Sequence, residues 1–260
     1  MSDEARFKKE VRANIEGIAN DEQLKQKTLD WMIHAGGKHG YSYNFSWLGR
    51  PIIQYPQDMV GMQELIWTVR PDLIIEMGIA HGGSLILNAS MLALLEYAEA
   101  VESGNTLDPS QPRRRVLGVD IDIREHNRAA IEAHPMSGSI DMIEGSSIEA
   151  DTIARVREHA AGFDTILLVL DSNHTHAHVL AELEAYADLT SVGSYCVVFD
   201  TLVEDTPDEY FADRPWGKGD NPKTAVWEFL KTHPEFEIDK EIEAKLLITV
   251  APDGFLRRRA

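Results

Sequence analysis

Apolar residues in the first part of the chain recur at helical spacing between charged ones. They are Val11, Ile15, Ile18, Leu24, Leu29 and Met32. This spacing predicts a helix over residues 3–35, and the glycine-rich run 36–40 breaks it. We therefore expect an N-terminal helical extension over residues 1–40 and a main domain over residues 41–260. A further helix is expected over residues 59–69, with Asp58 as its N-cap.

After Pro71, short apolar runs alternate with longer amphipathic segments. The apolar runs predict strands at 73–75, 116–119, 140–143, 165–170, 195–199, 236–242 and 246–250. The segments between them predict helices at 84–102, 124–133, 148–159, 175–189 and 222–232. Alternating strands and helices indicate an α/β fold, with a doubly wound, mostly parallel seven-stranded sheet.

A glycine-rich turn follows the first of these strands. Glu76 ends the strand, and Gly78, Gly82 and Gly83 allow a sharp turn and close approach of a ligand to the backbone. The turn also carries His81 and Ser84, and it leads into a helix N-terminus that favours polar or anionic groups. It lacks the lysine of a nucleoside-triphosphate loop, so the pattern predicts a nucleoside pocket.

Polar residues recur at the carboxyl ends of the later strands, where open α/β sheets bind ligands. Asp120 is expected to accept hydrogen bonds from ribose hydroxyls, with Asp122 as the alternative. Gly145 and Ser146 are expected to hold an adenine. NAD enzymes recognise ribose in the same way, but the spacing of Gly78, Gly82 and Gly83 suits a methionine-bearing nucleoside better. We expect the absent side chain of Gly82 to leave room for the methionine part.

Asp171 and Asp200 end the fourth and fifth strands and are expected to converge across the cleft. Two carboxylates with open solvent positions suit Mg²⁺. Asn173 and Thr201 lie beside them in the sequence. His174 is the candidate general base. His176 and His178 follow at alternate positions, which send their side chains in different directions and argue against a three-histidine zinc site.

Composition narrows the class of protein. The 260 residues are 43% hydrophobic and carry a formal net charge of -18, which argues against nucleic-acid binding. The single cysteine, Cys196, lies in an apolar run and is expected to be buried. It excludes an intramolecular disulfide, and the sequence shows no apolar run of transmembrane length, so a cytoplasmic protein without a membrane span is expected.

Several segments together resemble the cephalosporin hydroxylase and rhamnosyl O-methyltransferase family. These segments are 70–78, 81–84, 170–179, 193–201 and 245–258. The most specific is the Asp-Ser-x-His-x-x-x-His-Val block that starts at Asp171. The resemblance spans roughly residues 41–258 and implies a Rossmann-like class I fold that binds S-adenosylmethionine, with a Mg²⁺ site near the methyl donor.

The resemblance implies that Asp171 and Asp200 are the metal ligands. Asp171 is also expected to contact the methyl donor. One position departs from the family pattern: Phe199 stands where the family usually has Glu. Either waters and a neighbour such as Asn173 complete the site, or metal binding is weaker. An acceptor-facing Phe199 could also give the pocket an apolar wall.

The sequence therefore predicts a Mg²⁺-assisted O-methyltransferase that acts on a sugar hydroxyl, with His174 and Asp171 as catalytic residues. A deoxysugar such as rhamnose, in a glycosylated natural product or glycolipid, has vicinal hydroxyls for the metal. It also has a methyl face for an aromatic residue of the run Tyr41 to Trp47. One alternative is β-lactam 7-hydroxylation or methoxylation; another is a non-catalytic, cofactor-binding partner subunit. We further expect a homo-oligomer, because members of the family commonly form oligomers.

Overall fold

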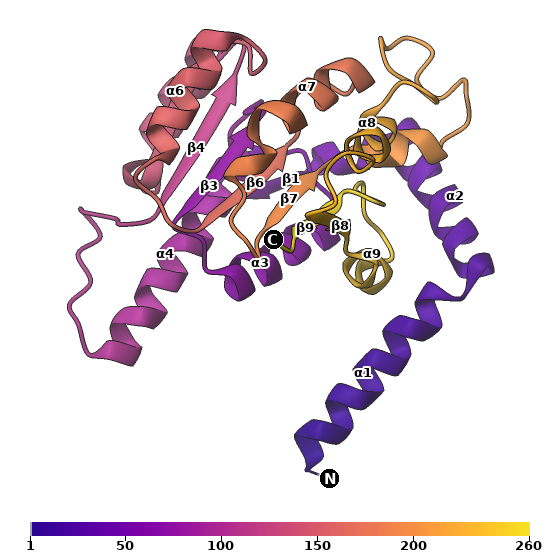
Figure 1. Cartoon of the computed structure of the whole chain (residues 1–260), viewed down its shortest axis with the longest axis horizontal. Helices are drawn as coiled ribbons and strands as arrows, with labels where there is room; N and C mark the ends of the chain where they lie inside the picture. Colours follow the sequence, from indigo (N-terminus) through magenta and orange to yellow (C-terminus); the bar gives the residue numbers. More distant parts are fainter. Residues whose placement is uncertain (1) are drawn as a thin grey trace.

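A computed structural model describes residues 2–260 and is built around one seven-stranded sheet (Figure 1). The strand order is β5-β4-β3-β6-β7-β9-β8. The strands are β3 (Leu73–Met77), β4 (Arg115–Asp120), β5 (Ile140–Glu144), β6 (Ile166–Leu170), β7 (Tyr195–Val198), β8 (Phe236–Ile238) and β9 (Phe255–Arg258). The first five run parallel, whereas β9 pairs antiparallel with both β7 and β8. The predicted mostly parallel seven-stranded sheet is confirmed.

Helices cover both faces of this sheet. They are α3 (Pro56–Val69), α4 (Gly83–Ser103), α5 (Glu125–Glu132), α6 (Ala150–Ala160), α7 (His176–Tyr186) and α8 (Pro222–Phe229). Side chains of α6, α7 and α8 form the core on one face, and side chains of α3, α4 and α5 form the core on the other. The fold is therefore doubly wound, as predicted, because alternating crossovers leave both faces of a parallel sheet apolar.

The final strand is not where the sequence predicted it. Residues 246–250 form no strand: Leu246 is the last residue of helix α9 (Lys240–Leu246), and 247–250 lie in the loop after it. Strand β9 begins at Phe255, after the turn at Asp253 and Gly254. The preceding strand is also shorter than expected, since β8 ends at Ile238. Asp239 caps α9 by accepting bonds from the backbone N–H groups of Glu241 and Ile242, which ends the strand there.

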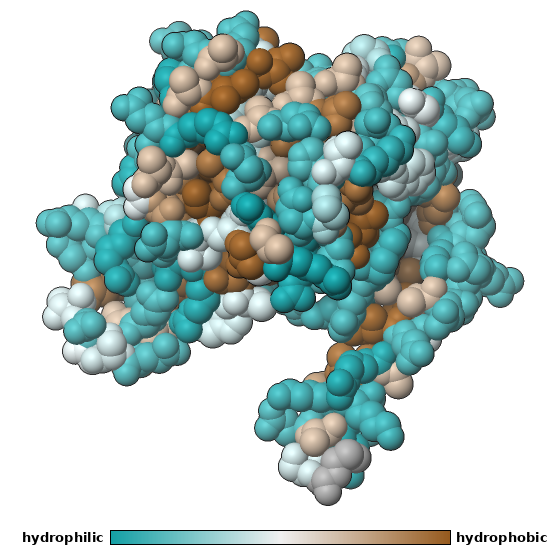
Figure 2. All heavy atoms as spheres, in the orientation of Figure 1, coloured by the Kyte–Doolittle hydropathy of each residue, from teal (hydrophilic) through white to brown (hydrophobic). Residues whose placement is uncertain are grey.

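The N-terminal helix predicted over residues 3–35 is two helices, α1 (Asp3–Ala19) and α2 (Glu22–His39). Asp21 separates them because its side chain caps α2 by accepting from the N–H of Leu24. The second helix continues through the predicted break at Gly36 and ends in the left-handed region at Gly40. Helix α1 contacts α9, its N-terminal end extends away from the body of the molecule (Figure 1), and the face shown in Figure 2 is mostly hydrophilic.

Asp58 was predicted to be the N-cap of α3, but it lies within the first turn of the helix. Tyr55 occupies the cap position, and Pro56 is the first helical residue. The Asp58 side chain is buried, and its Oδ2 accepts from the N–H of Val250 at 3.1 Å. Burial raises the pKa of Asp58 to about 7.

Two further elements matter for the cavity described below. The strands β1 (Phe45–Trp47) and β2 (Arg50–Ile52) form an antiparallel hairpin, for which no strands were predicted. Helix α4 is long and apolar enough to cross a membrane by length and composition. Ten of its residues are buried against the rest of the protein, so it is a core helix of this fold.

Candidate active site

The glycine turn lies between the end of β3 and the start of α4, and its glycine positions leave no room for a Cβ atom. Gly78 has φ of +100°, and a Cβ atom there would stand 2.1 Å from the carbonyl oxygen of Asp171. Glu76, directly before the turn, is buried and accepts from the Ser84 hydroxyl and, at 2.8 Å, from Nδ2 of Asn88. Burial raises the pKa of Glu76 to about 7.

Gly82 serves packing and not the space for a methionine group, which corrects one expectation. A Cβ atom at Gly82 would meet Cδ1 of Ile131 on α5 at 2.4 Å. At Gly83 it would stand 2.2 Å from the carbonyl oxygen of Pro51 in β2. These two glycines therefore let α5 and the β1–β2 hairpin approach the turn closely.

The strand-end residue Asp120 holds the glycine turn in place. Its Oδ2 accepts from the N–H groups of Ile79 at 2.8 Å and Ala80 at 3.3 Å, and its Oδ1 accepts from the N–H of Asp122. Asp122 itself is exposed in the following loop. The N–H of Gly145 donates to the Asp120 carbonyl at 2.9 Å, so the ends of β4 and β5 meet at this edge.

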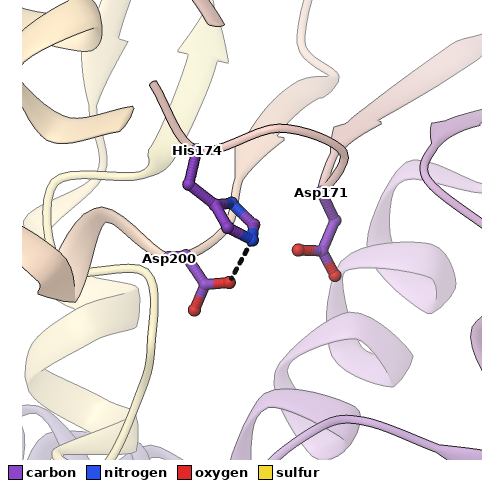
Figure 3. Close-up of side chains that lie close together, drawn as sticks. All are labelled: Asp171, His174 and Asp200. Carbon is purple, nitrogen blue, oxygen red and sulfur yellow. Dashed lines mark ion pairs between the residues drawn. The ribbon is translucent and has the colours of Figure 1, made fainter. Parts of the chain in front are cut away.

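Asp171, His174 and Asp200 converge at the carboxyl edge of the sheet (Figure 3). One ligand atom from each lies within 4.8 Å of the others, and Nε2 of His174 is 3.1 Å from Oδ2 of Asp200. Burial, and then the neighbouring charge of Asp200, hold the pKa of Asp171 well above its usual value. Three potential ligands facing one another, with repulsion between the carboxylates, form a candidate cation site.

The other candidate ligands have different partners. Asn173 accepts from the N–H and hydroxyl of Thr175, and the buried Thr201 hydroxyl donates to the Pro252 carbonyl. Nδ1 of His176 lies 2.8 Å from the Thr224 hydroxyl, and Nε2 of His178 lies 3.2 Å from Glu182. The three histidines therefore diverge, as expected, and Asn173 is committed to the start of α7.

The cluster opens into a cavity of about 490 Å³. Of the residues predicted to bind the donor, Gly78, His81, Gly83, Ser84 and Asp171 line it. Within residues 2–260, the lining leaves out Glu76, Gly82, Asp120, Gly145 and Ser146. The structure therefore brings the glycine turn close to Asp171. Asp120, Gly145 and Ser146 lie farther along the same sheet edge, at the ends of β4 and β5.

The opposite wall of the cavity was not foreseen from the sequence. It comes from α2 and from the loop 206–216, including Tyr210, Arg214 and Trp216. The Trp216 ring stands edge-on to His174, with centroids 4.8 Å apart. Tyr210 packs on α2, where a Cβ atom at Gly37 would meet its ring at 2.6 Å. This loop has no hydrophobic periodicity, and its aromatic residues were the only available signal.

The aromatic run at residues 41–47 contributes one aromatic side chain to the cavity lining. Tyr43 lines the cavity, whereas Tyr41 and Phe45 pack edge to face with 5.1 Å between centroids, and Nε1 of Trp47 donates to Ser90. Phe199 does not face the acceptor side of the cavity, contrary to one expectation. It is 4% exposed and lines a small inner chamber behind Asp171.

The fold and the site together define the class. A doubly wound sheet places a glycine turn and a carboxylate cluster around one cavity, as in α/β enzymes that bind a nucleoside cofactor at the carboxyl edge. Residues 39–259 match the family described as rhamnosyl O-methyltransferase/CmcI. The chain belongs to this family and is an O-methyltransferase that depends on S-adenosylmethionine.

Relatives support this assignment. A rhamnosyl O-methyltransferase of Mycobacterium bovis (strain BCG / Pasteur 1173P2) is 30% identical over 203 residues, covering 77% of this chain and 73% of the relative. One of Mycobacterium leprae is 29% identical, covering 82% and 83%. The apo structure of CmcI shares the fold, with a TM-score of 0.57, 20% identity and coverage of 84% of this chain and 77% of CmcI.

Proposed function

We propose that this enzyme transfers a methyl group to a hydroxyl of a sugar, most favourably a deoxysugar such as rhamnose, with the assistance of Mg²⁺. The acceptor would be a glycosylated natural product or a glycolipid. The observation that carries this proposal is the cluster of Asp171, His174 and Asp200 at the floor of the cavity (Figure 3). The relatives named rhamnosyl O-methyltransferase support the choice of acceptor.

The residues of the cluster fit a hard divalent cation. Two carboxylates supply oxygen ligands, and their mutual repulsion in a half-buried site is relieved when a cation lies between them. Asp171 and Asp200 would hold Mg²⁺, and His174 is close enough to be a third ligand. When bound, the ion would lower the pKa of a sugar hydroxyl beside it. The side-chain oxygen of Asn173 already accepts two hydrogen bonds from Thr175, so we do not include Asn173 in the set.

We propose that the methyl donor lies along the glycine turn. Gly78, His81, Gly83 and Ser84 line the cavity and would surround its amino-acid end, to which Gly82 would contribute backbone only. Glu76 would hold the Ser84 side chain by accepting its hydroxyl hydrogen bond. Asp120 would accept from the ribose, and Gly145 and Ser146 would hold the adenine. Asp171 would then face both donor and acceptor, because it lies against Gly78 on one side and His174 on the other.

His174 is proposed as the general base that takes the acceptor proton. Asp200 orients its ring by contacting Nε2, and the Trp216 ring stands edge-on to it. Because His174 also has a ligand atom facing both carboxylates, the variant His174→Gln separates two roles. Loss of turnover with an unchanged Mg²⁺ dissociation constant identifies a base, while weakened Mg²⁺ binding identifies a ligand.

Methyl-labelled S-adenosylmethionine and a panel of acceptors test the proposed function. The panel contains rhamnosides, matched glucosides and a cephalosporin, each with Mg²⁺ and with EDTA. We expect the labelled methyl group to appear in the rhamnosides when Mg²⁺ is present and not when EDTA is present. Label on the cephalosporin would favour the β-lactam alternative, and bound donor without transfer to any acceptor would favour the non-catalytic one. Failure to label any deoxysugar while the donor is bound would refute the proposal.

We also propose that the protein is a cytoplasmic homo-oligomer without a membrane span or nucleic-acid partner. Helix α1 supports the oligomer because its N-terminal end extends away from the body with Phe7 66% exposed. None of the residues of α1 is buried within the chain, so the helix is free to pack against a second copy. Light scattering at micromolar concentration checks this, and a monomer would contradict it.

A further inference from the structure

A small inner chamber lies beside the main cavity, on the far side of Asp171. The chamber has a volume of about 10 Å³, which is room for one group the size of a water molecule. Gln54, Ser84 and Asp171 line both the main cavity and the chamber. A ligand group that extends from the main cavity into the chamber would therefore contact these three residues.

Buried oxygen atoms around the chamber lack hydrogen-bond donors. Nε2 of Gln54 donates to Asp171 at 3.4 Å, which directs the amide oxygen of Gln54 away from that carboxylate. This Oε1 atom, Oδ1 of Asp58 and Oδ1 of Asn88 have no hydrogen-bond partner among residues 2–260. Gln54 is 7% exposed, Asn88 3% and Asp58 1%. These three buried oxygens are therefore able to accept hydrogen bonds from a group that is not part of the chain.

The charge around the chamber narrows the class of that ligand. Carboxyl groups of Asp58, Glu76 and Asp171 line it, and no lysine or arginine does so within the described chain. A small cationic group with several N–H donors would satisfy the unpartnered oxygens, and its charge would favour the ionised form of the neighbouring carboxyl groups. A primary ammonium group has this size, charge and donor number.

We propose that the amide oxygen of Gln54 accepts a hydrogen bond from the α-ammonium group of the methyl donor at the mouth of this chamber. The inference rests on the proposed function, since it assumes that S-adenosylmethionine lies along the glycine turn. One carbon atom separates the ammonium and carboxylate groups of the donor, so they must occupy adjoining sites. The backbone N–H of Ser84, in the first turn of α4, suits the carboxylate, because the Ser84 hydroxyl donates to Glu76. Gln54, which lines the same two cavities, suits the ammonium.

Three ligands distinguish recognition of the ammonium group from a general effect on the site. S-adenosylhomocysteine carries both the amine and the carboxylate, its decarboxylated form keeps only the amine, and methylthioadenosine lacks both. Titration calorimetry with Gln54→Leu at pH 7.5 is expected to show weaker binding of the first two ligands by roughly ten- to hundredfold. Binding of methylthioadenosine is expected to change by less than about twofold, because it has no group to contact Gln54.

Gln57→Leu is the matched control. Gln57 lies in the first turn of α3 and also has a buried amide oxygen without a partner in residues 2–260, but it lines neither cavity. It is expected to leave all three affinities unchanged. If Gln54→Leu does not fold, as judged by circular dichroism, Gln54→Met replaces it with a side chain of similar length and no oxygen.

Two results would overturn the inference. One is unchanged binding of S-adenosylhomocysteine by the Gln54 variant; the other is an equal loss for all three ligands. Failure of the proposed function gives a different pattern, because it would appear as absent binding of S-adenosylhomocysteine to the parent protein or as absent methyl transfer to sugars. The selective effect of Gln54 on amine-bearing ligands is measured without acceptor, metal or turnover.

Discussion

Replacing Asp171 by asparagine should stabilise the metal-free protein while abolishing its response to Mg²⁺. In the absence of a cation, the Asp171 carboxylate lies in a half-buried position near Asp200, and its pKa is held well above the usual value by burial and by that neighbour. Asparagine has nearly the same shape and keeps an oxygen that accepts from Gln54, but it carries no charge. The substitution therefore removes repulsion and leaves the packing intact.

The magnitude follows from the separation of the two carboxylates. Their facing oxygens are no more than 4.8 Å apart, which gives a repulsion of about 3.5 kcal/mol at an effective dielectric of 20 and about 0.9 kcal/mol in bulk water. A half-buried pair lies between these limits, so we expect a gain of about 1–3 kcal/mol at pH 8. For a chain of this length, that corresponds to a rise in Tm of roughly 2–10 °C.

The pH dependence has a definite sign. A carboxyl group whose pKa is raised by folding favours the folded state while it is protonated, below its pKa in the unfolded chain. This contribution is lost as the pH rises from about 4 through the folded-state pKa of Asp171. The difference in stability between Asp171→Asn and the parent should therefore be small near pH 4 and largest at pH 8.

Urea and thermal unfolding in EDTA, followed by titration with Mg²⁺, measure both effects. Mg²⁺ at one hundred times its dissociation constant should stabilise the parent by about 2.7 kcal/mol and the variant far less. The reasoning would be refuted if Asp171→Asn were less stable than the parent in EDTA at pH 8. An equal Mg²⁺ response in the two proteins would refute the assignment of Asp171 as a ligand.

Three further substitutions test other parts of the structure. Gly78→Ala should destabilise the fold by more than about 3 kcal/mol, because its Cβ would stand 2.1 Å from a carbonyl oxygen at a φ of +100°; circular dichroism checks this against Gly162→Ala, where nothing lies within 4 Å. Asp58→Asn should raise stability at pH 8 by up to about 4 kcal/mol and little at pH 4, since burial raises the pKa of Asp58 to about 7; a pH-independent difference in urea unfolding would contradict this. Phe199→Glu, which restores the usual family residue, should lower Tm and leave Mg²⁺ affinity unchanged, because Phe199 lines the acidic inner chamber; tighter Mg²⁺ binding would show instead that this side chain reaches the cation site.

The sequence by itself determined the architecture of the main domain. Buried parallel strands must be apolar on both faces, so the strand ending at Glu76 and the strand ending at Asp171 read as short continuous hydrophobic runs. Because parallel strands end at the same edge, the order of residues along the chain already placed Asp171 and Asp200 together. Their approach to His174 within 4.8 Å confirms that expectation.

Local signals failed where tertiary contacts choose between alternatives. Residues 246–250 have the composition of a strand, but the capped helix before them and the turn at Gly254 leave the pairing position beside β7 to Phe255–Arg258. Asp58 has the sequence signature of an N-cap, yet it is buried and accepts from the N–H of Val250. Helix caps and edge strands depend on partners distant in the chain, which hydrophobic spacing does not encode.

The walls of the cavity were decided only by the tertiary structure. Tyr210 and Trp216 belong to an irregular loop, and their approach to α2 and His174 depends on contacts with residues far away in the chain. Only the packed structure shows that a side chain at Gly82 would collide with α5. A sequence predicts which residues end a strand because periodicity is local, whereas the facing wall of a cavity is set by the packing of separate elements.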